Sequence, residues 1–268
     1  MKIGSLFSGA GLGDLGFVMA GCEIAFQIEI DEYCQKILEL RYPSAKKFRD
    51  IKTVKGSELP RCDIVSGGFP CQPFSFAGKR NGKADNRYLW PEMFRIIGEI
   101  KPPWVVAENV VGFIKIALDD VCNDLESIGY ETITIVFPAH ALGAWHRRQR
   151  VWIIANAKGP RTKQNIQELW RLPSRCGEKQ EKLGLENENK QAMADSSSER
   201  LEEQKLFERH SFIESENHRD YWSVEPPVGR VVDGCPSRMD RLKSIGNGQV
   251  PACTKWIAEN IIEIVNWI

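Results

Sequence analysis

The sequence predicts an α/β fold with a mostly parallel sheet that is covered by helices on both faces. Short apolar runs typical of buried strands alternate with segments of helical periodicity, and this alternation indicates a parallel sheet. Polar or glycine-rich residues follow several of the strands directly; they are Ser8-Gly9, Glu29, Asp50, residues 67–71 and Glu108-Asn109. In such sheets the ligand crevice lies at the carboxyl ends of the strands, so we expect these residues to meet there.

The first predicted unit is a strand, a glycine turn and a helix. Residues 2–7 form a short apolar strand, glycines follow at positions 9, 11, 13 and 16, and residues 17–20 lie in a helix. The next apolar run, residues 23–28, ends at Glu29. Asp31 can cap a helix that runs to about Arg41, because Tyr33, Ile37, Leu38 and Leu40 suit one helical face.

The later elements continue the alternation. Further strands are predicted at residues 62–66, 104–107, 130–137 and 151–155. Helices are predicted at residues 87–100, 115–128 and 251–268, where apolar residues recur at a spacing of three to four.

The composition is that of a globular protein with a sizeable core. The 268 residues are 42% hydrophobic, and Lys+Arg equals Asp+Glu at 36 each, which neither indicates nor excludes a nucleic-acid partner. The eight cysteines show no Cys-x-x-Cys spacing, so we expect no metal site. A secretory signal and a membrane-spanning run are not evident, which predicts a cytoplasmic protein with free thiols and no membrane association.

The composition changes after Ala157 and predicts the domain organisation. From Lys158 to about Asp220 the chain is polar, with few apolar clusters, and apolar order returns at Tyr221-Trp222. We therefore predict a main domain at 1–156, a small polar insert at 157–221 and a C-terminal segment at 222–268 that packs back on the main domain.

The glycine turn indicates a nucleoside ligand. Glycines after a first strand let a ligand approach the backbone closely, and Glu29 at the end of the second strand is placed to accept hydrogen bonds from ribose hydroxyls. Asp50-Ile51 could hold an adenine. Because no Gly-x-Gly-x-x-Gly stands at the usual place after the strand and no P-loop Lys-Ser/Thr occurs, an adenosine compound is favoured over a nicotinamide or a triphosphate. A tight turn without a ligand is the alternative.

Cys71 stands in an unusual setting, within Gly-Gly-Phe-Pro-Cys-Gln-Pro-Phe-Ser at 67–75. Pro70 and Pro73 restrict the backbone, so this is a shaped loop at the end of a strand. A thiol held on such a loop is suited to a nucleophile, whereas the alternative is an ordinary buried cysteine.

Three further segments could carry chemistry. Glu108-Asn109 follows a strand, so Glu108 is either a solvated helix cap or a carboxyl kept protonated by desolvation that donates to a ring nitrogen. Arg148 and Arg150 lie two apart on an extended stretch and would share one face, suited to a phosphate or a base edge or simply to solvent. Residues 245–251 are either a loop-to-helix junction or a tight backbone near a ligand.

Together and in this order, the segments resemble the DNA (cytosine-5)-methyltransferase family. Residues 7–17 are similar to its cofactor motif, 68–75 to its nucleophile motif and 108–110 to its acid motif. Residues 146–151 are similar to its arginine motif and 246–251 to its closing motif. The resemblance implies the Rossmann-like fold of class I S-adenosylmethionine-dependent methyltransferases.

The resemblance covers about 1–156 and 222–268 and makes 157–221 a small target-recognition insert. The sequence departs from the family pattern at Leu12-Gly13, which is transposed, at Ile30, where an aromatic residue often stacks on adenine, and at His146 and Gly248, which replace a common Gln and a common Ser or Ala. These changes remove no group that the reaction requires.

The resemblance also implies roles for individual residues. Cys71 would attack carbon 6 of cytosine, Glu108 would hold ring nitrogen 3 and the amine, and Arg148 and Arg150 would orient the base and its phosphate. S-adenosylmethionine would be bound by a set of residues that are Phe7, Ser8, Gly9, Ala10, Gly11, Glu29, Ile30, Asp50, Ile51, Pro70 and Asn247. The substrate would be contacted by Gln72, Ser75 and Asn109.

The implied substrate is a flipped-out cytosine in a specific sequence of double-stranded DNA. The resemblance implies a monomer in a bacterial or phage-infected cell and allows for a cognate restriction endonuclease. The alternatives are a tRNA cytosine-5 methyltransferase and a catalytically silent module that binds nucleic acid. A cysteine hydrolase would need a histidine base near a motif, where only His140 and His146 stand.

Overall fold

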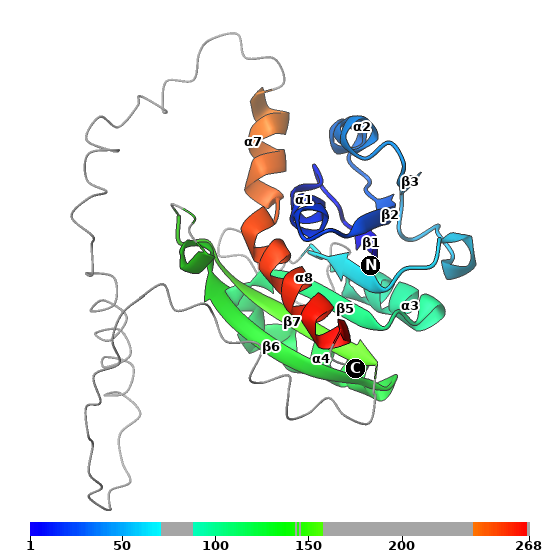
Figure 1. Cartoon of the computed structure of the whole chain (residues 1–268), viewed down its shortest axis with the longest axis vertical. Helices are drawn as coiled ribbons and strands as arrows, with labels where there is room; N and C mark the ends of the chain where they lie inside the picture. Colours follow the sequence, from blue (N-terminus) through cyan, green and yellow to red (C-terminus); the bar gives the residue numbers. More distant parts are fainter. Residues whose placement is uncertain (71–87, 143, 145, 158–237, 267–268) are drawn as a thin grey trace, which may run out of the picture. The chain divides into compact units, whose positions relative to one another are not determined.

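A sheet of seven strands forms the centre of the computed structural model, in the order β3-β2-β1-β4-β5-β7-β6 (Figure 1). The structure describes residues 1–70, 88–142, 144, 146–157 and 238–266. The strands are β1 (Lys2–Leu6), β2 (Glu23–Ile28), β3 (Lys46–Phe48), β4 (Ile64–Gly67), β5 (Trp104–Val110), β6 (Tyr130–Pro138) and β7 (Gln149–Ala157). Pairing is parallel from β3 across to β5, whereas β7 runs antiparallel to both β5 and β6. The predicted mostly parallel α/β sheet is confirmed.

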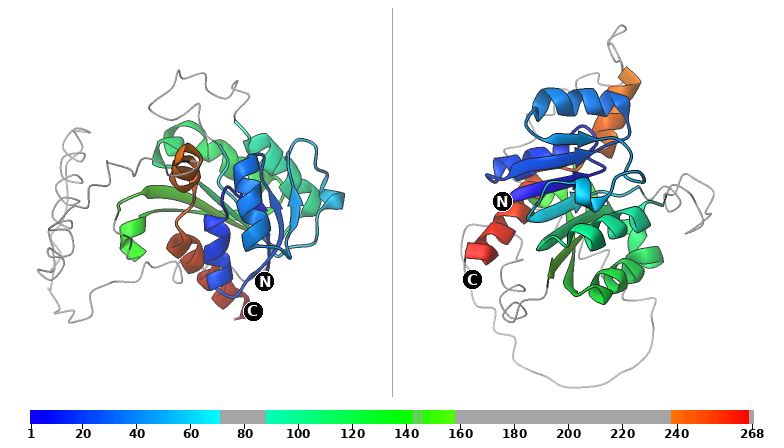
Figure 2. Two further views of the ribbon diagram at one scale, coloured as in Figure 1. Left: turned by 90° about the horizontal axis from the view of Figure 1, so that it is seen from above. Right: turned by 90° about the vertical axis from the view of Figure 1, so that its right-hand side faces the viewer.

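Helices cover both faces of this sheet, as predicted (Figure 2). They are α1 (Leu12–Met19), α2 (Glu32–Arg41), α3 (Trp90–Ile100), α4 (Ile114–Ser127), α7 (Arg238–Asn247) and α8 (Pro251–Asn266), with short 3-10 turns at η1 (Gly56–Glu58), η4 (Val111–Phe113) and η5 (Ala139–Leu142). None of the helices in the described part of the chain is long and apolar enough to cross a membrane.

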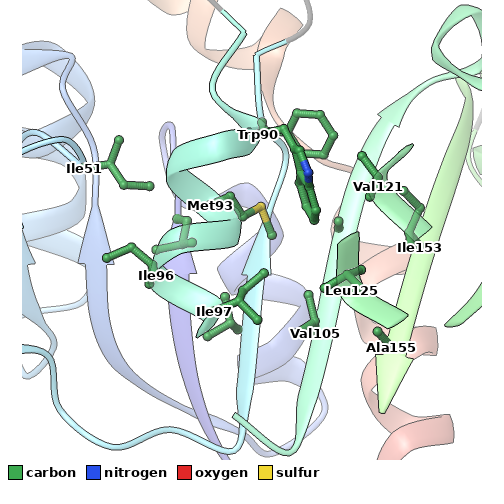
Figure 3. Close-up of a cluster of buried hydrophobic side chains, with 14 of the residues drawn as sticks. Ile51, Trp90, Met93, Ile96, Ile97, Val105, Val121, Leu125, Ile153 and Ala155 are labelled. Atoms are coloured by element: carbon green, nitrogen blue, oxygen red, sulfur yellow. The ribbon is translucent and has the colours of Figure 1, made fainter. Parts of the chain in front are cut away.

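Two hydrophobic cores separate the sheet from its helices. On one face, α3 and α4 pack through Met93, Ile97 and Val121 against the strand residues Val105 and Ile153 (Figure 3). On the other face, α1 and α8 lie side by side and bury a second set, which includes Phe17, Ile257 and Ile261 with Ile3, Val106 and Ile154. Successive strand residues face opposite sides, which explains why neighbours such as Val105 and Val106 join different cores.

Several boundaries differ from the prediction. The strand expected at 104–107 continues to Val110, so Glu108 and Asn109 are strand residues and not the start of a loop or a helix cap. The reason is that β7 pairs with β5 beyond the point where β4 ends, with Glu108 opposite Trp152. The predicted strand at 151–155 is correspondingly longer.

A strand before Asp50 was expected without a residue range, and α7 was not predicted. β3 has three residues, and α7 is a largely polar helix whose one buried side chain in the described positions is Ser244, so neither carries a strong apolar pattern. The described residues all belong to one compact unit. The predicted domain boundaries at 156 and 221 stay predictions.

Candidate active site

A pocket of about 930 Å³ opens at the carboxyl ends of the central strands. It brings together most of the predicted site residues that the structure describes, from elements far apart in the sequence. The predicted residues that line it are Phe7, Gly9, Glu29, Ile30, Asp50, Ile51, Pro70, Glu108, Asn109, Arg148, Arg150 and Asn247. The expectation that residues after strands meet at one sheet edge therefore holds.

Three of the predicted cofactor residues lie outside this lining. Ser8 forms a hydrogen bond between its hydroxyl and that of Ser5, 2.8 Å apart, and Gly11 accepts one at its carbonyl from the Tyr42 hydroxyl at 2.6 Å. Ala10 stands between them in the turn. These residues shape the glycine turn from behind, because the turn directs only Phe7 and Gly9 toward the pocket.

The glycine turn has an unusual backbone. Gly9 and Gly11 have φ angles of 55° and 76°, and Phe7 has a φ of 54°. The left-handed region costs a residue with a side chain about 1–2 kcal/mol, and such strain tends to concentrate at functional sites. A Cβ at Gly9 would meet no atom of the described residues within 4 Å, so the backbone there borders space that this part of the chain leaves open.

Glu29 holds the turn in place. Its Oε2 accepts from the Gly9 N–H at 2.7 Å, and its Oε1 accepts from the Asp31 N–H at 2.8 Å. A carboxylate has about four acceptor positions, so each oxygen keeps room for one more donor. Asp31 caps α2 as predicted, accepting from the Cys34 N–H at 3.1 Å.

Glu108 is a buried carboxyl with a cationic partner. Arg150 Nε lies 2.9 Å from its Oε1. Burial raises the pKa of Glu108 above its ordinary value, and Arg150, Arg148 and the Gln249 side chain oppose that rise. Desolvation outweighs the opposing groups, so the Glu108 carboxyl takes up a proton more readily than an exposed glutamate.

Asn109 fixes the segment that leads into the predicted nucleophile loop. Its Nδ2 donates to the Phe69 carbonyl at 3.3 Å. The Phe69 ring packs on Trp90 and Phe113, each with a centroid distance of 5.3 Å, which anchors the residues before Pro70. Cys71, Gln72 and Ser75 themselves lie outside the described residues.

Arg148 and Arg150 line one pocket but act differently. Arg148 precedes β7 with a left-handed φ of 27°, so the two side chains do not follow the simple alternation of a strand that we predicted. Arg148 Nη2 donates to the carbonyls of Gly246 and Gly248, at 2.8 Å and 2.6 Å. It ties the loop between α7 and α8 to the site, whereas Arg150 pairs with Glu108.

The family model of C-5 cytosine-specific DNA methylases matches residues 1–262. The chain belongs to this family. The predicted resemblance to this family is confirmed, whereas the assignment of Glu108, Arg148 and Arg150 to its acid and arginine motifs stays a prediction.

Curated relatives agree with this membership. The Type II methyltransferase M.FnuDI of Fusobacterium nucleatum is 36% identical over 163 residues, which are 59% of this chain and 47% of the relative. M.HaeII of Haemophilus aegyptius is 36% identical over 157 residues, which are 56% and 48% of the two chains. The chain thus spans about half the length of the curated relatives it matches.

One solved structure supports the fold alone. The S. pombe Dnmt2 methyltransferase superposes with a TM-score of 0.53 at 21% identity, covering 71% of this chain and 62% of that chain.

The residues that α7 and α2 bring to the pocket were not predicted from the sequence. Lys243 Nζ lies 2.6 Å from Asp31 Oδ2, and the Ser244 hydroxyl lies 3.4 Å from Cys34 Sγ. All four line the pocket, as do Arg49 and Lys52. The pairs join positions more than 200 residues apart, and no local pattern predicts such contacts.

Proposed function

We propose that this protein is a DNA cytosine-5 methyltransferase that uses S-adenosylmethionine as its methyl donor. The observation that carries the proposal is the pocket itself, which joins the glycine turn and Glu29 at one end to the buried Glu108–Arg150 pair at the other. The family membership and the Type II methyltransferase names of the relatives support DNA as the substrate over tRNA.

The part of the pocket near β1 and β2 fits an adenosine compound. Gly9 leaves open space beside its backbone, and Glu29 has spare acceptor positions for ribose hydroxyls. Ile30 is 63% exposed and offers an apolar surface for a purine ring, with Asp50 nearby in the lining. When bound there, S-adenosylmethionine supplies an electrophilic methyl group on its sulfonium.

The other part of the pocket fits a cytosine ring. A protonated Glu108 can donate to ring nitrogen 3, and its second oxygen can accept from the exocyclic amine. Arg150 keeps the carboxyl in place, while Asn109 fixes the backbone before Pro70. Groups that are set before the reaction stabilise developing charge without reorganising, which is a large source of catalysis.

Cys71 is proposed as the nucleophile. Its thiolate would form a bond to carbon 6 of the base, and the electron pair of the 5,6 double bond would move to carbon 5, which Glu108 would assist by protonating nitrogen 3. Carbon 5 would take the methyl group with this electron pair, and the neutral thioether would leave. Water would then accept the proton on carbon 5, the electron pair of that C–H bond would restore the 5,6 double bond and expel the thiolate, and nitrogen 3 would return its proton to Glu108. The base must leave the duplex first, at a cost of a few kcal/mol.

The wider setting stays a prediction. The Type II names of the relatives support a role in restriction–modification, with a cognate endonuclease as partner. A monomeric state and a cytoplasmic location are proposed on the same basis.

The test is transfer of labelled methyl groups to duplex DNA and, side by side, to tRNA. We expect incorporation into DNA, its loss in Cys71→Ala, and a covalent adduct of the wild type with 5-fluorocytosine DNA. Cys122→Ala is the matched control, because Cys122 is a half-buried thiol of α4 outside the pocket lining. Undiminished transfer by Cys71→Ala would contradict the proposal, and bisulfite sequencing of the product would identify the target sequence.

A further inference from the structure

The side chain of Gln249 occupies a space that two glycines leave open beside Glu108. A Cβ added at Gly13 would collide with Gln249 Oε1. A Cβ added at Gly68 would lie 3.2 Å from Gln249 Nε2 and 2.9 Å from Glu108 Oε2. The amide therefore lies between α1, the segment after β4 and the candidate acid, and a side chain at either glycine would displace it.

The backbone that carries Gln249 is held firmly. Arg148 Nη2 donates to the carbonyls of Gly246 and Gly248, which flank Asn247 just before Gln249. The Gly248 N–H donates to the Ser244 carbonyl at 3.1 Å, and α8 begins at Pro251. These contacts determine where the Gln249 side chain starts, so its reach toward Glu108 is set by the fold.

The amide has an unused donor that faces the carboxyl. Gln249 Nε2 is buried and completes no hydrogen bond with the described residues, yet the Gln249 side chain is close enough to Glu108 to lower the pKa of that carboxyl. A buried donor without an acceptor is unfavourable, and a small rotation of the carboxyl would satisfy it. Gln249 itself does not line the pocket.

We propose that Gln249 is a positioning residue that holds the Glu108 carboxyl from the side opposite the pocket. This inference rests on the proposed function for its catalytic meaning, because it assigns Gln249 the task of orienting the proposed acid toward the base. Arg150 holds one oxygen, at 2.9 Å, and the Gln249 amide would hold the other after a small rotation of the carboxyl. Together they would leave the carboxyl with one orientation in which to meet a ring nitrogen.

Other charged and titratable groups around Glu108 also affect its pKa. Arg150 of β7 and Arg148 before β7 favour the ionised carboxyl, and the thiol of Cys253 in α8, whose pKa is raised to about 12, lies within its field. None of these changes when Gln249 is replaced. Loss of the amide removes one stabiliser of the charged form, so the pKa of Glu108 should rise further.

The first experiment needs no catalysis. Carbon-13 NMR of carboxyl-labelled glutamate, assigned with Glu108→Gln, follows the titration of Glu108 in the ligand-free protein. We expect its pKa to rise in Gln249→Met and to rise more in Gln249→Glu, where a second carboxyl replaces the amide. If Gln249→Met fails to fold, Gln249→Asn replaces it as the test variant. Its side chain is one methylene shorter, so its amide should not reach Glu108 and the pKa of Glu108 should rise as well. A Glu108 titration that is unchanged in these variants would overturn the inference.

The second experiment measures single-turnover methyl transfer against pH. In Gln249→Met we expect the rate to fall about 10- to 100-fold, with little change in affinity for S-adenosylmethionine, and the alkaline limb to move to higher pH. A purely space-filling role would lower the rate without moving the limb, which would contradict the inference. If the wild type transfers no methyl group to DNA, the proposed function fails, while the NMR result still decides whether Gln249 controls Glu108.

Discussion

Arg150 Nε lies 2.9 Å from Glu108 Oε1, across the antiparallel pairing of β7 with β5. Arg150 stands opposite Val110, two residues beyond Glu108, so the two side chains are diagonal neighbours on one face of the sheet. The Arg150 and Glu108 side chains are only 23% and 10% exposed, and solvent therefore screens their attraction less than it would at the surface. The sheet register itself thus pairs the candidate acid with its cation.

Replacing Arg150 with Met should lower stability in a pH-dependent way. Arg150 holds the pKa of Glu108 below the value that burial alone would give, so its loss raises that pKa further. We expect the free energy of unfolding to fall by about 1–3 kcal/mol at alkaline pH, which favours the ionised carboxyl, and by less in acid, which favours the protonated carboxyl in both proteins.

Urea denaturation at two pH values measures this difference. Arg147→Met is the matched control, because Arg147 is the neighbouring arginine on an exposed position. An equal loss at both pH values would mean that Arg150 stabilises the fold by packing alone.

Gly9→Ala should weaken cofactor binding more than it weakens the fold. Gly9 has a φ of 55°, and Gly21 has a φ of 84°, with open space beside both. Alanine in the left-handed region costs about 1–2 kcal/mol at either position. Of these two glycines only Gly9 lines the pocket. We therefore expect Gly9→Ala, but not Gly21→Ala, to bind S-adenosylmethionine at least about tenfold more weakly than the wild type. Calorimetric titration of both variants checks this, and similar weakening in Gly21→Ala would refute it.

Asp14→Asn should stabilise the protein at neutral pH. Asp14 is buried beneath the glycine turn, where desolvation raises its pKa from 3.8 to about 6 against the hydrogen bonds from Ser5 and Gln27. The folded state therefore binds this proton more tightly than the unfolded chain, so stability falls as pH rises from 3.8 to about 6.

The asparagine lacks this ionisation and can still accept from Gln27. Relative to wild type, its free energy of unfolding should increase by on the order of 3 kcal/mol between about pH 4 and pH 7. Unfolding by urea across this range measures the trend, with Asp119→Asn at an exposed position of α4 as control. If the free energy of unfolding of Asp14→Asn differed from that of the wild type by the same amount at every pH, a buried, proton-binding Asp14 would be contradicted.

The ion pair between Asp31 and Lys243 should contribute less to the free energy of unfolding than the cap that the same Asp31 carboxylate forms on α2. Lys243 is 63% exposed, so Lys243→Met should cost at most about 1 kcal/mol, and the cost should vanish at about 1 M salt. Asp31→Ala also removes the cap of α2 and should keep a cost of about 1 kcal/mol at high salt.

Denaturation at low and high salt separates the two contributions. The hydrogen bond from Lys243 lowers the pKa of Asp31 below 3.8, so the stabilisation by this carboxylate should persist above that pH and be lost as pH falls through the lowered pKa. Equal losses for the two variants at high salt would contradict a separate capping role.

Much of the candidate site could be predicted because it lies where strands end. The positions of Gly9, Glu29, Glu108 and Arg150 follow from apolar runs and the residues after them, and all of them line the pocket. The direction of each side chain was harder to predict. Glu29 binds the backbone of the turn, and Arg148 binds the carbonyls of Gly246 and Gly248, because these donors and acceptors come from distant segments.

The sequence by itself determined the order of strands and helices, the parallel character of the sheet and the motifs that identify the family. Local periodicity and residue type suffice for these, since each element depends on its own apolar face. Only the tertiary structure decided that β5 continues through Glu108, that Lys243 and Ser244 of α7 bond to Asp31 and Cys34, and that Gln249 lies beside the acid. Each of these results from pairing or packing between segments distant in the sequence, whose geometry no local pattern encodes.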